Sequence, residues 1–509
     1  MAPLMFGGLV CFLLIGYPAA FSLAAVGLFF AIFGIRFGLF VPDFMGNLTY
    51  QLFSVVSNDL LLAIPFFTFM GAILERCGLA EDLLDSIGQL FGPVRGGLSY
   101  AVIIVGAILG AITGTVAASV IAMGIISLPV MMRYGYDMKH TTGVIAASGT
   151  ITQLIPPSLV LVVLADVLGR SVGDMYIGAT IPSLIQLALF CGWVFILSMI
   201  WPKAVPALPP EARTLRGWAL LSKCLWGIIP SGALIFLVLG TMFMGLATPT
   251  EAGAMGAVGS LLLAAAKRTL TPSLVYQAMG STMRITAMVV MILIGARTFS
   301  LVFNGVGGGE WIAHLLSGLP GGQTGFLIFV NIFIFFVAFF LDFFEIAFII
   351  IPLLAPVAEK MGIDLIWFGV LICANIQTSF MHPPFGFALF YLRGIAPPEV
   401  KSSDIYLGSI PWIILQICLV AILIAWPGSV TMMLDSGKKI DTSKMEIVIP
   451  SMGMGGGPGG LGPSPFGLPP GLGGPPPGLG GPPPGLTPPP AIPGLTPPPA
   501  LPAPETKSN

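Results

Sequence analysis

Long apolar stretches recur along most of the chain and limit the folds that it can adopt. A bilayer core about 30 Å thick needs about 20 apolar residues for each helical crossing. Only 8% of the 509 residues are charged, whereas soluble domains carry about 25%. We therefore expect an all-α polytopic membrane protein, with spans near 5–33, 56–74, 142–166, 176–200, 226–246, 251–266, 285–303, 365–391 and 405–428.

Two further apolar stretches, 97–132 and 324–357, are too long for one crossing and short for two. Each has small or polar residues near its middle: Thr113-Gly114-Thr115 in the first, and Asp342 and Glu345 in the second. A helical hairpin that enters the membrane and returns fits both. Such a hairpin persists only where protein or a wet cavity covers its irregular backbone.

An internal repeat relates the two halves of the chain. The segment that ends at Asp137 resembles the one that ends at Asp364, 227 positions later. Without a gap, Pro156-Pro157 falls on Pro383-Pro384, and Gly78 falls on Gly305. Lys and Arg favour cytoplasmic loops, and their positions predict that the repeats are inverted. The same count predicts a cytoplasmic N-terminus. No Lys or Arg precedes the long first apolar run, so we expect an uncleaved first span.

The repeated Pro-Pro pairs predict two helices that break inside the membrane, at 148–158 and 375–384. Proline leaves helical carbonyls without donors, and both segments are rich in hydroxyl and amide side chains. Hard cations prefer such oxygen ligands, so we expect Na⁺ as a coupling ion and no other cofactor. The alternative is a kink satisfied by its own hydroxyls. Our Na⁺ candidates are Ser148, Gly149, Thr150, Asp342, Glu345, Asn375, Thr378 and Ser379.

Ionisable residues inside apolar segments indicate functional sites, because their burial in lipid is costly. Asp342 and Glu345 lie three positions apart and would bind a cation or a proton, or else form a structural ion pair. Arg297 would pair with them or bind a substrate carboxylate. His382 is either a titrating group or a packing residue. Our candidate substrate-binding residues are Thr113, Thr115, Ser119, Thr152, Gln153, Ser158, Arg297, Gln377 and His382.

The chain is expected to divide into two repeats set between other spans. From about residue 451 it is dominated by Pro and Gly, a composition that cannot form a packed core. The expected parts are N-terminal scaffold spans (1–75), repeat 1 (76–175), scaffold spans (176–284), repeat 2 (285–400), a C-terminal span (401–430) and a disordered tail (431–509).

Three motifs resemble one family of membrane proteins. The segment GAITGTVAASVIAMGIISLPVM at 110–131, the IPPS at 155–158 and ATPTEAGA at 247–254 are similar to the large (M) subunit of tripartite ATP-independent periplasmic (TRAP) transporters. The resemblance covers about residues 1–430. LDFFE at 341–345 and MHPP at 381–384 resemble a subgroup associated with mannitol or chloroaromatic compounds.

This resemblance implies an elevator-type, Na⁺-coupled importer of a small organic acid. It implies a bacterial inner membrane location and two partners, which are a small four-span membrane subunit and a soluble periplasmic substrate-binding protein. It also places the hairpin tip at 113–119 and both broken segments at the substrate and Na⁺ sites. Two other classes stay open from the residues alone: an intramembrane enzyme that uses Asp342, Glu345 and His382, and a channel. No HExxH, GxSxG or GxGD motif supports the enzyme.

Overall fold

The computed structural model describes residues 1–213, 217–339 and 341–434, and in these residues every regular element is helical. Of the C-terminal tail predicted at 431–509, residues 435–509 lie outside the described residues. Six described helices are long and apolar enough to cross a membrane, and a bent pair at 42–56 and 59–76 makes a seventh if it is one span. The expectation of an all-α polytopic membrane protein is confirmed.

The N-terminal apolar run forms two helices instead of the single predicted span at 5–33. Gly16, at φ 92°, ends α1 in the left-handed conformation, and Pro18 is the N-cap of α2. Glycine adopts this conformation without strain, and proline cannot continue the preceding helix. The elements before the first repeat are α1 (Ala2–Ile15), α2 (Ala19–Arg36), η1 (Pro42–Gly46), α3 (Asn47–Val56), η2 (Asp59–Leu62) and α4 (Ala63–Arg76).

The first repeat contains the predicted hairpin and the predicted broken helix. α6 (Gly97–Thr113) and α7 (Val116–Arg133) pack against each other and are joined by Gly114 and Thr115. Gly114, at φ 63°, allows the sharp reversal. The remaining elements are α5 (Leu79–Phe91), α8 (Met138–Thr150), η3 (Ile151–Gln153), α9 (Leu159–Val167) and α10 (Val172–Ile200).

Between the repeats lie η4 (Pro210–Ala212), α11 (Trp218–Ile235), a π-helical turn η5 (Phe236–Gly240), α12 (Thr241–Phe243), α13 (Pro249–Ala266) and α14 (Pro272–Gly305). The 34-residue α14 packs along α2 and α4. Close approach to α2 depends on glycine, because a Cβ at Gly295 would lie 2.3 Å from the Ala20 carbonyl oxygen. Small residues promote such helix contacts in membranes.

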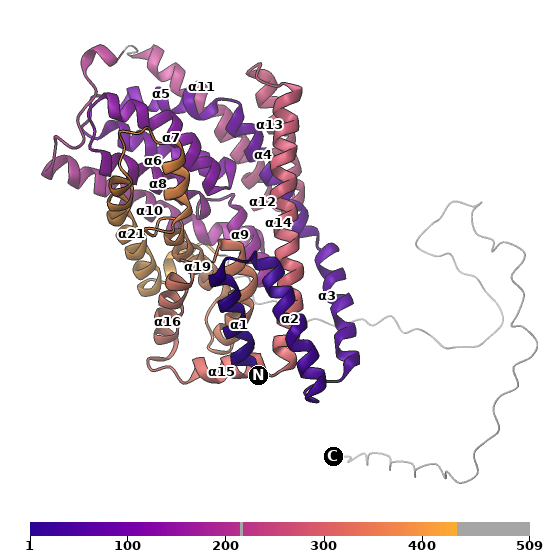
Figure 1. Ribbon diagram of the computed structural model, residues 1–509. Coiled ribbons are helices and arrows are strands. Elements are labelled where there is room, and N and C mark those ends of the chain that lie inside the picture. Colours follow the sequence, from indigo (N-terminus) through magenta and orange to yellow (C-terminus); the bar gives the residue numbers. More distant parts are fainter. Residues whose placement is uncertain (214–216, 340, 435–509) are drawn as a thin grey trace, which may run out of the picture. The chain divides into compact units, whose positions relative to one another are not determined.

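The second repeat has the same order of elements. α16 (Gly322–Val337) and the helical segment 343–360 form its hairpin, and the latter consists of α17 (Phe343–Glu345), the π-helical turn η6 (Ile346–Ile350) and α18 (Ile351–Lys360). Figure 1 shows α6 and α7 near one end of the helical body and α16 near the other, which is the arrangement expected of inverted repeats. The remaining elements are α15 (Gly308–Ser317), α19 (Leu365–Ser379), α20 (Phe387–Ile395), α21 (Ser402–Ala425) and α22 (Gly428–Thr431).

The structure corrects the register of the repeat before the hairpins. Gly78 and Gly307, at φ 73° and 77°, are the N-caps of α5 and α15, so Gly78 corresponds to Gly307 and not to Gly305. Later in the repeat the predicted register holds. Asp137 and Asp364 both cap their helices by accepting a backbone N–H three residues on, from His140 at 3.0 Å and Trp367 at 2.8 Å. Loops between elements absorb small insertions.

Candidate functional site

The first broken helix runs from α8 through the turn η3 to α9. Its freed carbonyls are hydrogen-bonded by side chains of neighbouring residues. Ser183 Oγ donates to the Leu154 carbonyl at 2.9 Å, and Ser158 Oγ donates to the Gln153 carbonyl at 2.5 Å. Tyr176 donates to the Ser158 carbonyl at 3.3 Å. The sequence predicts that a cation coordinates these carbonyl oxygens. In the structure, a side-chain donor already occupies one lone pair of each.

The second broken helix interrupts α19 after Ser379 and resumes at α20. Here the carbonyls accept backbone N–H groups, from Met381 to Thr378 at 2.9 Å and from Gly386 to His382 at 2.6 Å. Asn375 Nδ2 donates to the Asn331 carbonyl of α16 at 2.8 Å. Both Pro-Pro bonds, 156–157 and 383–384, are cis. The predicted interruption of the two helices is confirmed.

The two breaks lie against each other. Cys373 Sγ, on α19, donates to the Gln153 carbonyl at 3.3 Å, and Thr150 Oγ1 lies 3.6 Å from Met381 Sδ. Close packing with hairpin 1 supports this arrangement, because a Cβ at Gly110 would lie 2.7 Å from Thr152 Cα. Segments more than 200 residues apart in the sequence therefore meet in one buried region.

Two buried glutamines connect each repeat to the broken helix of the other. Gln186 Nε2, on α10, donates to Gln377 Oε1 at 2.5 Å. Gln416 Nε2, on α21, donates to Thr150 Oγ1 at 3.0 Å. All four side chains are fully buried. Thr150 and Gln377 are 227 positions apart and Gln186 and Gln416 are 230 apart, so the two contacts are repeat mates.

Most of the predicted hydroxyl ligands donate within their own helix. Ser148 and Thr150 donate to carbonyls three residues back at 2.8 and 3.0 Å. Thr378 and Ser379 do the same at 2.7 and 2.6 Å. A hydroxyl that donates its proton keeps lone pairs that can accept a donor or bind a cation. Gly149 has no such side chain, and a Cβ there would lie 2.2 Å from Val120 Cγ2.

Several buried polar atoms around the breaks have no hydrogen-bond partner within the described protein. Native proteins leave few such atoms, so a group of them indicates a place for ions, water or ligand. The atoms are Thr152 Oγ1, Gln153 Oε1, Gln186 Oε1, Gln377 Nε2, Gln416 Oε1, Asn331 Oδ1 and both ring nitrogens of His382.

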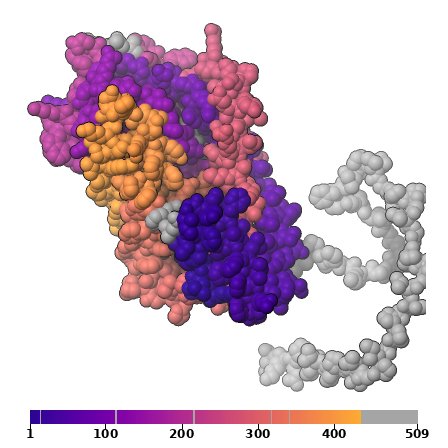
Figure 2. Space-filling view, viewed as in Figure 1, coloured from indigo at the N-terminus to yellow at the C-terminus, as the bar shows by residue number. Residues whose placement is uncertain are grey.

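A cavity of about 710 Å³ connects the tips of the two hairpins with the first break. We call it the central cavity. Gly114 to Ala117 contribute the tip of hairpin 1, and Asp342 to Glu345 contribute the tip of hairpin 2. Residues 18–21 of α2 and residues of α14 and α20 complete the wall. Figure 2 shows the N-terminal residues in indigo and those around α20 in orange on the same face of the molecule.

Asp342 and Glu345 form a capping box at the start of the helical segment 343–360, and neither joins an ion pair of the described residues. Glu345 Oε2 accepts the backbone N–H of Asp342 at 3.0 Å. The structural ion pair considered from sequence is therefore replaced by a helix cap. Carboxylates at a helix N-terminus interact favourably with its dipole.

The structure brings only some of the predicted substrate residues to the central cavity. Thr115 and Gln153 line it, and Gln153 is 2% exposed. Ser119, Thr152, Ser158 and Gln377 are buried nearby in the helices and breaks, while the side chain of Thr113 lies outside the described part of the structure.

Arg297 is separate from the two acids with which the sequence interpretation grouped it. It lines another cavity, of about 450 Å³, together with Asp166, Gln51 and Asn304. This position follows from the packing of α14 along α2 and α4, which the sequence pattern does not reveal.

His382 packs between two aromatic rings. Its ring centroid lies 4.2 Å from those of Phe335 and Phe339. It is 2% exposed and is not among the residues that line the central cavity. The described residues contain no group of three or more His, Cys, Asp or Glu side chains that could hold a metal ion. Asp342, Glu345 and His382 do not form one reactive centre.

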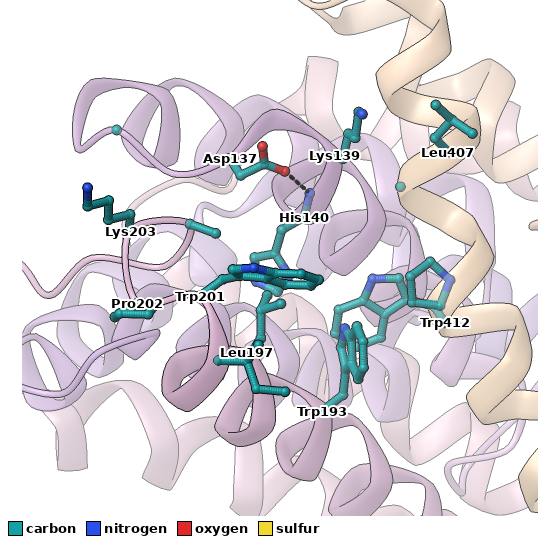
Figure 3. A pocket seen from close by; sticks show the side chains of 15 residues that line it. Asp137, Lys139, His140, Trp193, Leu197, Trp201, Pro202, Lys203, Leu407 and Trp412 are labelled. Atoms are coloured by element: carbon teal, nitrogen blue, oxygen red, sulfur yellow. Dashed lines mark hydrogen bonds between the residues drawn. The ribbon is translucent and has the colours of Figure 1, made fainter.

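A different cavity, of about 840 Å³, lies at the N-terminal end of α8, which is the end opposite the break. Figure 3 shows Trp193, Trp201 and Trp412 gathered in it, with Lys139 and Lys203 at its edge. Tryptophan and lysine are typical of the membrane–water interface. The break begins 13 residues along α8, which is about 20 Å at 1.5 Å per residue. This length is shorter than a bilayer core about 30 Å thick, so it is compatible with a break inside the membrane.

Comparison with known proteins agrees with this architecture. The family model described as "Tripartite ATP-independent periplasmic transporter, DctM component" matches residues 6–429. The C4-dicarboxylate TRAP transporter large permease protein DctM of Pseudomonas aeruginosa is 31% identical over 76% of this chain and 88% of its own length. The ectoine TRAP transporter large permease protein TeaC of Halomonas elongata is 28% identical over 84% of this chain and 97% of its own length.

The solved structure of the YdaH transporter of Alcanivorax borkumensis, described as having an unusual topology, has the same fold. Its TM-score is 0.53 at 16% identity, over 78% of this chain and 89% of that one. The names of the relatives do not support the mannitol or chloroaromatic subgroup that LDFFE and MHPP resemble. The relatives are transporter permeases and not enzymes, so this is a multi-pass membrane transport protein. The chain belongs to the family of the DctM component of tripartite ATP-independent periplasmic transporters.

Proposed function

We propose that the chain is the translocating subunit of a Na⁺-coupled importer for a small organic acid. The observation that supports this most directly is the contact between the two inverted, broken helices, beside a cavity that both hairpin tips line. Binding sites at the bilayer midplane, between inverted repeats, are a common transporter plan. The hairpins would carry the substrate past α2 and α14 in an elevator-type movement.

The substrate would bind in the central cavity. Its carboxylate would lie at the N-terminus of α7, which has no side-chain cap and no acidic residue in its first turn. Free backbone N–H groups and the helix dipole favour an anion at such a terminus. Thr115 and Gln153 line the same cavity and would orient the substrate.

Sodium would bind at the breaks, where unpaired oxygens are concentrated. Thr152 Oγ1 has no partner among the described residues. The hydroxyls of Ser148, Thr150, Thr378 and Ser379 keep lone pairs after donating to carbonyls. This set of oxygens suits a hard cation. Binding of Na⁺ would stabilise the contact between the breaks and so favour the substrate-ready state.

The proposed partners are a small four-span membrane subunit and a soluble periplasmic substrate-binding protein. The matched family is described as one component of a tripartite transporter, and this chain would supply only the translocation path. The proposed location is a bacterial inner membrane, with the N-terminus in the cytoplasm. One relative is named for a C4-dicarboxylate and another for ectoine, so the family relationship leaves the substrate to be identified.

The test is Na⁺ dependence after removal of hydroxyl oxygens at the breaks. Thr378→Val and Ser148→Ala each remove one candidate ligand, and we expect each variant to need several-fold more Na⁺ for half-maximal uptake into liposomes. The assay includes the proposed small subunit and binding protein. Thr282→Val is the matched control, because Thr282 makes a similar hydrogen bond, to the Ala278 carbonyl at 2.9 Å, on α14, which belongs to neither broken helix. Unchanged Na⁺ dependence in both variants would place the ion elsewhere.

A further inference from the structure

We infer that the substrate is a zwitterion whose cationic group is received by Asp342 and Glu345, at the end of the central cavity formed by hairpin 2. The inference rests on the proposed function in taking this cavity as the transport site. It narrows the small organic acid to one that also carries an ammonium-type nitrogen. Four observations on the residues that line the cavity support it.

The first observation is an unbalanced pair of carboxyl groups. Asp342 and Glu345 both line the cavity, and neither forms an ion pair with a basic residue. Among the described residues of the lining there is no Lys, Arg or His. A substrate that brought only negative charge to this end would meet two acids and no counter-charge. A cation would favour the ionised form of both acids and would be stabilised by them.

The second observation is a difference between the two helix N-termini that face the cavity. At hairpin 2 the start of the segment 343–360 is already covered by the capping box of Asp342 and Glu345. At hairpin 1 the side chain of Thr115 does not cap α7, whose first turn has no acidic residue. One end of the cavity therefore favours an anion and the other favours a cation. A zwitterion matches both ends.

The third observation is a buried polar group at the cavity wall. Gln153 lines the cavity and is 2% exposed, and its Oε1 has no hydrogen-bond partner among the described residues. A buried acceptor without a donor is costly. A positively charged group beside this oxygen, either an ammonium or a quaternary ammonium centre, would stabilise it, which a fully deprotonated dicarboxylate cannot do.

The fourth observation is the aromatic character of the wall next to the acids. Phe343 and Phe344, with ring centroids 4.8 Å apart, lie between Asp342 and Glu345 in the sequence and line the same cavity. Phe380, Phe387 and Tyr391 also line the cavity. Aromatic faces attract organic cations, including quaternary ammonium groups. Such a wall suits an organic cation better than a metal ion, which would need more oxygen ligands than these rings supply.

The test uses two probes that differ only in charge. Glycine betaine and 3,3-dimethylbutanoate have the same shape, since a quaternary nitrogen in the first replaces a carbon in the second. We expect glycine betaine to raise the thermal unfolding temperature of the purified full chain in nanodiscs more than its carbon isostere 3,3-dimethylbutanoate or succinate does. An equal or larger shift with either of those acids, or no shift with glycine betaine, would overturn the inference.

Variants assign the effect to the two acids. Asp342→Asn and Glu345→Gln keep side chains that can still cap a helix, so folding should be retained. Each should weaken betaine binding roughly tenfold to a hundredfold, the value of one charge-assisted contact. Glu251→Gln is the control, because Thr248 and Glu251 form a capping box of the same kind at the start of α13, outside the central cavity. Equal discrimination in all variants would contradict the assignment.

A chemical probe tests the charge of the cavity without any bound ligand. Ala117→Cys places a thiol at the cavity wall, in a background where the exposed Cys11 and Cys418 are replaced by Ser. A methanethiosulfonate with a trimethylammonium head should react faster than one with a sulfonate head, relative to a free thiol. Asp342→Asn should reduce that preference. No preference, or a preference for the sulfonate, would contradict the inference even if the variants bind poorly.

None of these measurements uses a Na⁺ gradient, a partner subunit or a binding protein. A chain that discriminates the probes but shows no Na⁺-driven uptake would refute the proposed function alone. A chain that takes up its substrate with Na⁺ but ignores the charge of the probes would refute only the inference about a zwitterion.

Discussion

The buried contact between Gln186 and Gln377 allows a quantitative test of how the two repeats are held together. The two amides share one hydrogen bond at 2.5 Å, and neither side chain is exposed. Gln186→Leu would leave Gln377 Oε1 without a donor, and Gln377→Leu would leave Gln186 Nε2 without an acceptor. An orphaned buried polar group costs about 1–3 kcal/mol.

The double variant gives the decisive value. With leucine at both positions no amide is left unpaired, so its cost should be smaller than the sum of the single costs by about 1–3 kcal/mol. The assay is the free energy of unfolding from titration with sodium dodecyl sulfate. Gln277→Leu is the control, since Gln277 is exposed on α14 and should change this energy by less than about 0.5 kcal/mol.

Additive costs would refute the reasoning, because independent sites add within about 0.5 kcal/mol. The repeat-related contact provides an internal check. Gln416→Leu combined with Thr150→Val should show a coupling of the same sign, since Gln416 Nε2 donates to Thr150 Oγ1 at 3.0 Å.

Two further predictions concern packing and surface charge. Gly110→Ala should destabilise the chain by about 1–3 kcal/mol, because the new Cβ would lie 2.7 Å from Thr152 Cα. Gly280→Ala is the control: a Cβ there has nothing within 4 Å, so this change should be neutral or stabilising by up to about 1 kcal/mol. Equal free energies of unfolding for the two variants would contradict the prediction. Asp85→Asn breaks the exposed ion pair with Lys223 and should change the unfolding energy by less than about 1 kcal/mol; a larger loss that persists in high salt would show that the pair is structural.

Much of the fold could be predicted from sequence because membrane insertion imposes strong, local rules. The apolar length of each span and the position of Pro-Pro pairs identify the hairpins and both broken helices. One span was predicted at 5–33, but the structure has two helices there. The prediction was wrong because Gly16 and Pro18 interrupt a run that stays apolar throughout. Hydropathy does not detect a break that changes the backbone without changing polarity.

The site was harder to predict, since it depends on contacts between distant segments. Gln186 and Gln416 were not singled out, although a buried amide in an apolar span is itself a signal, and their spacing matches the repeat. The capping role of Asp342 and Glu345 could have been inferred from their spacing of three residues at a helix start. The separation of Arg297 from Asp342 and Glu345 could not have been inferred, because it depends on which helices α14 packs against.

The length of α14 has a consequence for the surface of the protein. Its 34 residues extend about 51 Å at 1.5 Å per residue, well beyond a hydrocarbon layer about 30 Å thick. Tilting shortens its vertical reach only in part, so its first turns, where Ser273, Gln277 and Arg284 are exposed, stand in the headgroups or in water. A soluble protein that approaches the bilayer on this side would contact the first turns of α14 before it contacts lipid.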